Sequence, residues 1–118
     1  MAWAAVNPPD PELTLKANGD VTWNSALQKM LSDPEWVDLM WDADASMLGV
    51  GGHDASCGGF PVSRDEATGT YTIDSSAALS DLGVSANPAH TEAPPGLWEN
   101  AITSADMPSW RDVYYITL

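Results

Sequence analysis

The chain has 118 residues, and 44% of them are hydrophobic, including six tryptophans, which is enough apolar material for one domain with a core. Seventeen acidic residues against four basic residues give a formal net charge of −13. This charge argues against nucleic-acid and membrane surfaces as partners, because affinity for phosphates comes largely from lysine and arginine. No stretch approaches the roughly 20 apolar residues that cross a bilayer. A single cysteine, Cys57, rules out an internal disulfide, so we expect a cytoplasmic protein, or a virion protein if the source is viral.

The acidic residues are spread along the whole chain and do not form a tail. Three explanations stay open at this stage. Proteins of halophiles and of high-GC organisms have such compositions, and an acidic surface also attracts a basic partner.

The N-terminal residues 1–12 contain Pro8, Pro9 and Pro11 and are predicted to form an extended arm. Trp3 would be a large apolar anchor near its end. We therefore expect this arm to be the chief partner-binding segment.

The first half of the remaining chain, residues 13–50, predicts a hairpin, a short helix and a second hairpin. A strand at residues 13–16 ends at Asn18-Gly19, the strongest two-residue hairpin signal, and a second strand follows at residues 21–23. Asn24 or Ser25 can cap a helix that begins there. Residues 36–41 then alternate, with Val37, Leu39 and Trp41 on one face, and a turn precedes a last strand at residues 46–50.

Residues 51–59 are rich in glycine and are predicted to be a flexible connector. The second half, residues 60–118, repeats the order of the first. Strands are expected at residues 60–64 and 70–74, a helix capped by Ser75 or Ser76, a left-handed C-cap at Gly83, and strands at residues 96–102 and 113–118. The two halves thus form a single β-rich domain over residues 13–118.

The first half is similar to the AbrB-like swapped-hairpin module. The residues that carry the resemblance are Gly19-Asp20-Val21-Thr22-Trp23-Asn24-Ser25-Ala26-Leu27, followed by Leu39-Met40-Trp41-Asp42. The resemblance implies an α+β, mainly β fold in which two ββαββ halves make a small pseudo-symmetric barrel. The family's DNA binding does not carry over, since Lys16 and Lys29 are the only basic residues of the first half.

His53, Asp54, Cys57 and His90 are the set that most resembles a metal or thiolate site. A structural zinc site needs four ligands with paired spacing, and the second pair is missing. Asp42 and Asp44 lack the glycine and the final acid of a calcium loop, so a turn held by carboxylates is the simpler interpretation. We expect no metal, no cofactor and no catalysis.

The tryptophans divide into two groups. Trp23, Trp36 and Trp41 lie on or beside predicted strands and are expected in the core. Trp3, Trp98 and Trp110 lie near prolines or loops, where they either pack on their own domain or remain as interface anchors. The predicted partner-binding residues are Trp3, Pro8, Pro9, Trp98 and Trp110.

These patterns favour a non-enzymatic protein-binding and assembly module, which docks on a protein scaffold or on copies of itself. A viral head or tail accessory protein has this character. Two alternatives are an AbrB-like transcriptional regulator from a halophile, and an acidic inhibitor that mimics nucleic acid.

Overall fold

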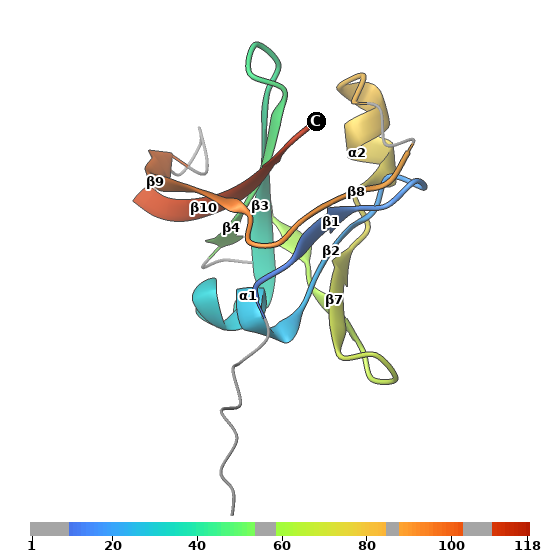
Figure 1. Cartoon of the computed structure of the whole chain (residues 1–118), viewed down its shortest axis with the longest axis vertical. Coiled ribbons are helices and arrows are strands. Elements are labelled where there is room, and N and C mark those ends of the chain that lie inside the picture. The colour runs from blue at the N-terminus through green and yellow to red at the C-terminus, as the bar shows by residue number, and fades with distance from the viewer. Residues whose placement is uncertain (1–9, 54–58, 85–87, 103–109) are drawn as a thin grey trace, which may run out of the picture.

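The computed structural model describes residues 10–53, 59–84, 88–102 and 110–118. Two antiparallel five-stranded sheets and two six-residue helices make up this part of the chain (Figure 1). The predicted mainly β fold is confirmed. Trp3, Pro8, Pro9 and Cys57 lie outside the described residues.

Each sheet takes strands from both halves of the chain. Sheet A has the order β6 (Ser63–Asp65), β7 (Thr70–Ile73), β2 (Val21–Trp23), β1 (Leu13–Leu15) and β8 (His90–Glu92). Sheet B has the order β5 (Phe60–Pro61), β3 (Trp36–Asp42), β4 (Met47–His53), β10 (Trp110–Thr117) and β9 (Gly96–Ile102). Helix α1 (Ser25–Met30) follows β2, and helix α2 (Ser76–Asp81) follows β7.

The hairpins of the two halves meet in the middle of each sheet. β2 pairs with β7 in sheet A, and β4 pairs with β10 in sheet B. Neither sheet closes on itself in the part of the chain that the structure describes, so the sheets are open there. Figure 1 shows β9 and β10 on one side of the molecule, with β7 and α2 on the other.

The core lies between the two sheets and follows the period-2 alternation of their strands. Its fully buried members include Leu15, Val21 and Trp23 from sheet A and Val50 and Ile116 from sheet B. The predicted inward face of β3 is also confirmed, since Val37 is buried and Leu39 and Trp41 pack against the core. Trp36 was also expected in the core, but it is half-buried and is not part of the core cluster.

Two segments differ from the expectation for residues 51–64. The predicted strand at residues 60–64 divides at Val62, so β5 pairs with β3 in sheet B and β6 pairs with β7 in sheet A. The N–H of Val62 donates to the Glu35 carbonyl at 2.9 Å. This bond fixes the position at which the chain passes from sheet B to sheet A. Gly51 and Gly52, predicted as connector, belong to β4. Gly52 packs closely, because a Cβ there would lie 3.1 Å from the Leu31 carbonyl oxygen, which is a tight contact.

The start of α1 is held by Asn24, as predicted. Its Oδ1 accepts from the N–H of Leu27 and of Glu12, both at 3.1 Å, and its Nδ2 donates to the Asp10 carbonyl at 2.7 Å. Asn24 therefore joins the end of the predicted arm to the helix. Ser75 occupies the equivalent position of α2, but its hydroxyl donates to the Gly19 carbonyl at 2.8 Å and caps no N–H.

The end of α2 is also as predicted. Gly83 has φ +75°, and the N–H of Val84 donates to the Leu79 carbonyl at 3.0 Å, as in a glycine C-cap.

No helix among the described residues has the length and apolar character needed to cross a membrane.

Candidate functional site

The face of sheet B that points away from sheet A is shaped by a glycine in the middle of β4. Gly49 stands opposite Met40 on one neighbouring strand and Tyr115 on the other. A Cβ at Gly49 would lie 2.5 Å from the Cγ1 of Val113, so the Val113 side chain packs over this glycine and is fully buried. The outer face is thus closely packed at its centre.

Tyr115 forms the next feature of this face, towards the edge of the sheet. It stands opposite Gly96 of β9, and a Cβ at Gly96 would overlap three atoms of the Tyr115 ring. The ring therefore lies across the start of β9. No larger residue than glycine would let it do so.

A hollow of about 230 Å³ opens beside this ring. It is lined by Asp42, Met47, Leu97, Trp98 and Tyr115. Leu97 and Trp98 are neighbours on β9, and their exposed fractions are 45% and 40%. Because β9 is the last strand of sheet B among the described residues, two large apolar side chains stand exposed at a sheet edge.

Asp42 places one carboxylate in the hollow. Its Oδ1 accepts from the backbone N–H of Asp44 at 3.0 Å and of Ala45 at 3.1 Å. The predicted carboxylate-held turn is therefore confirmed, and the same bonds fix the position of the Asp42 side chain.

A second hollow, of about 550 Å³, opens between the sheets at their other end. Its lining is mixed: Gln28, Asp33, Pro34, Glu35, Trp36, Pro61, Val62, Arg64 and Tyr71. Its buried amide is already used, since Gln28 accepts from Trp23 Nε1 at 2.7 Å and donates to the Pro34 carbonyl at 3.0 Å. Gln28 therefore has a structural role.

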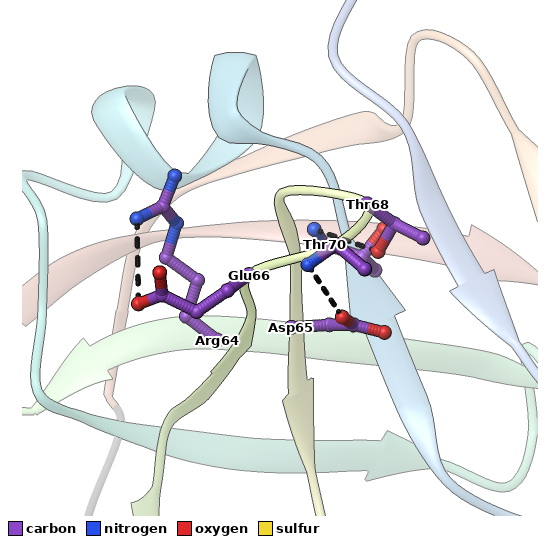
Figure 2. A network of polar contacts seen from close by, with 6 residues as sticks. Arg64, Asp65, Glu66, Thr68 and Thr70 are labelled. Atoms are coloured by element: carbon purple, nitrogen blue, oxygen red, sulfur yellow. Dashed lines mark hydrogen bonds and ion pairs between the residues drawn. The ribbon is translucent and has the colours of Figure 1, made fainter.

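Arg64, beside this second hollow, also interacts locally. Figure 2 shows it directed at Glu66. The Arg64 Nη1 and Glu66 Oε1 atoms lie 4.0 Å apart. The side chains of Asp65 and Thr68 accept hydrogen bonds within the turn between β6 and β7. The side chains of Arg64 and Glu66 are 54% and 88% exposed, so the pair contributes little to stability.

The candidate metal ligands are not gathered by the described structure. His53 ends β4 in sheet B, whereas His90 lies in β8 of sheet A. The Nε2 atom of His90 lies 3.8 Å from the Oε1 atom of Glu92. Asp54 and Cys57 lie outside the described residues. Within the described ranges, no three His, Cys, Asp or Glu side chains are grouped so that they could hold a metal ion.

Of the five predicted partner-binding residues, the structure places one side chain. Trp98 lines the hollow on sheet B. Trp110 pairs through its backbone with Ile102 at the far end of the β9–β10 hairpin, and its side chain is not among those described. Trp3, Pro8 and Pro9 lie outside the described residues, so their role stays a prediction.

Leu97, Tyr115 and Met47 were not predicted from the sequence as members of this site. The alternation of the last strand could have indicated Tyr115, since Tyr114 and Ile116 face the core and leave Tyr115 on the other side. Met47 needed the pairing of β3 with β4, which places it opposite Asp42.

Tyr114, on the core side of β10, provides a test of this packing. Burial, and to a smaller extent the nearby Asp112 carboxylate, raise the pKa of the Tyr114 phenol above its ordinary 10.0. As the pH rises, the Tyr114 phenol therefore loses its proton in the unfolded chain before it does so in the folded protein. The contribution of this group to the free energy of unfolding is complete below about pH 10 and is lost as the pH rises through the higher folded-state pKa. We expect wild type to lose more unfolding free energy than Tyr114→Phe between pH 7 and pH 11, measured by urea unfolding. Equal losses would contradict the assignment, and Asp112→Asn should give an intermediate loss.

Comparison with protein-family models, with curated proteins and with solved structures found no match for this chain. The resemblance to the AbrB-like module stays a prediction.

Proposed function

We propose that this chain is a non-enzymatic protein-binding module that assembles on a protein scaffold, and that it binds its partner along the outer edge of β9. The observation that carries the proposal is the adjacent pair Leu97 and Trp98, exposed on an edge strand beside a hollow.

The edge of a sheet is a surface for strand addition. Its unpaired N–H and C=O groups can bond to an extended partner segment, and side-chain pockets then supply specificity. Tryptophan is among the residues that dominate such interfaces. Met30, Leu82 and Leu118 are also exposed, but none of them lines the hollow on sheet B.

The other edge of sheet B supports the choice of β9. There, β5 pairs with β3 through Trp36 opposite Pro61 and Val37 opposite Phe60, and so covers the outer side of β3 at its first two residues. Within the described residues no strand covers β9 in this way. Among the described residues, the β9 edge therefore has no strand bonded to its outer side and is open to a partner segment there.

The formal net charge of −13 indicates the class of partner. It repels phosphate backbones and anionic membranes and attracts a basic protein surface. It also opposes contact between copies of this chain, so a separate scaffold is favoured over self-assembly. A role as a viral head or tail accessory, and binding by the arm of residues 1–12, stay predictions.

We also propose that the two halves are related by internal pseudo-twofold symmetry, as an open form of the small barrel expected from the sequence. The support is that each half gives its first hairpin to sheet A and its last to sheet B, with a helix between them. Under this relation β9 corresponds to β3, and β5 is what makes the two edges different.

The binding proposal is tested by selecting peptides from a displayed random library with the immobilised protein. The double variant Leu97→Ser/Trp98→Ala should bind the selected peptides at least about 30-fold more weakly, the effect of losing a tryptophan hot spot. Because both side chains are exposed, its unfolding free energy should stay within about 1 kcal/mol of wild type.

The matched control is Met30→Ser/Leu82→Ser, which removes two side chains that are 48% and 57% exposed elsewhere on the molecule. It should leave peptide affinity unchanged. Equal affinity for the β9 variant and wild type, or no peptide enriched at all, would refute the proposed function.

A further inference from the structure

We propose that the hollow beside Trp98 receives an arginine side chain of the partner segment. This inference rests on the proposed function of the β9 edge, and it names the chemistry of the group that the edge selects.

The size of the hollow favours one side chain over a small-molecule ligand. Sites for drug-sized ligands have volumes of about 300–1,000 Å³. The hollow has about 230 Å³, and two of its lining residues, Leu97 and Trp98, belong to β9, the last strand of sheet B among the described residues. It therefore suits a side chain that enters from a strand added at that edge.

The lining of the hollow favours a cation with a long apolar stem. Trp98 and Tyr115 supply aromatic rings, and Met47 and Leu97 supply apolar surface. Aromatic rings attract a cation placed over them, and the methylene groups of arginine pack on apolar surface while its charged end reaches a polar partner.

Asp42 decides between an apolar and a cationic side chain. A purely apolar occupant would remove water from its carboxylate without giving it a partner, which is unfavourable. The Oδ1 atom is held by the N–H groups of Asp44 and Ala45. No hydrogen bond to its Oδ2 atom occurs among the described residues, so a fixed carboxylate oxygen remains to accept from a cation.

Arginine fits this arrangement better than lysine. Its planar guanidinium can stack on an aromatic ring and bond to a carboxylate with the same group, whereas the lysine ammonium is a compact and strongly hydrated charge. The exposed Glu99, next to Trp98 on β9, adds to the field that attracts such a segment.

The experiment uses three synthetic strand-forming peptides, acetyl-Thr-Val-Xaa-Val-Thr-amide with arginine, lysine or citrulline at the middle position. Each is titrated into the whole protein and followed by NMR at the Trp98 indole N–H and the β9 backbone amides. The arginine peptide should bind about tenfold more tightly than the neutral citrulline peptide, the value expected of a hydrogen bond to a charged group, with lysine between them.

The variant Asp42→Asn should abolish the difference between the arginine and citrulline peptides. It keeps Oδ1 as an acceptor for the two N–H groups, so the turn is retained. Asp44→Asn is the matched control, because it removes the same charge from the same turn at a residue outside the hollow, and the difference should persist.

If arginine and citrulline peptides bind equally, or if Asp42→Asn and Asp44→Asn behave alike, the arginine assignment is wrong. Peptides that still depend on Leu97 and Trp98 would then leave the proposed function of the β9 edge standing. If neither these peptides nor the library yields a ligand that depends on Leu97 and Trp98, the proposed function fails, and the arginine assignment fails with it.

Discussion

Replacing Trp23 by alanine is expected to destabilise the protein by about 3–5 kcal/mol, the cost of removing a large aromatic side chain from a core. Trp23 is 1% exposed, and its Nε1 donates to the Gln28 Oε1 at 2.7 Å. The substitution removes a ring from between the sheets and also leaves the buried Gln28 oxygen without its donor, which adds about 1–3 kcal/mol. Since a domain of this size has about 5–15 kcal/mol of stability, this loss is a large fraction of the total.

Urea unfolding followed by circular dichroism measures this effect. Trp98→Ala is the control, because it makes the same chemical change at a side chain that is 40% exposed, and it should change the unfolding free energy by less than about 1 kcal/mol. Trp23→Phe should lie between wild type and Trp23→Ala, since it keeps a ring but loses the N–H donor. Similar midpoints for the two alanine variants would contradict the placement of Trp23 in the core.

A methyl group added at Gly49 is expected to destabilise the protein by about 1–3 kcal/mol, because the packed outer face of sheet B has no room for it. The new Cβ would lie 2.5 Å from the Cγ1 of Val113, whose side chain is fully buried. Gly49 lies in the middle of β4 between two paired strands, so the neighbouring backbone cannot move away easily.

The steric origin of this effect can be isolated with a double-mutant cycle. Val113→Ala removes the methyl group that Gly49→Ala would strike, so the double variant should be more stable than the sum of the single effects predicts, by about 1 kcal/mol or more. The control combines Gly49→Ala with Val21→Ala, which is equally buried but lies in sheet A, and those effects should add. Additivity of Gly49→Ala with Val113→Ala would show that the two groups do not meet as the structure places them.

The features that the sequence predicted are those set by neighbours along the chain. Asn18-Gly19 marks the β1–β2 turn, Asn24 caps α1, and Gly83 ends α2 with a positive φ. The inward face of β3 followed from alternation alone. Each of these depends on a few consecutive residues, whose backbone preferences act before any tertiary contact forms.

Part of the candidate site could be predicted in the same way, but only residue by residue. Trp98 was predicted to be a partner-binding residue because prolines or loops lie near it, and Asp42 was predicted to be a turn-forming carboxylate. That they lie in one hollow with Tyr115 follows from two pairings, of β3 with β4 and of β10 with β9. No local pattern specifies which strands become neighbours.

Tertiary structure alone decided which sheet edge is covered and which glycines are structural. The segment at residues 60–64 reads as one strand, yet it divides between the sheets because Val62 bonds to Glu35 from the first half. β8 forms within a proline-rich loop because β1 offers it an edge, with Thr14 and Thr91 hydroxyls 2.7 Å apart. Gly51 and Gly52 were predicted to be flexible, but both belong to β4, and the Leu31 carbonyl and the Pro34 side chain lie close to Gly52. Strand partners far apart in the sequence determine all of these, so the physical information lies in contacts that form only when the chain folds.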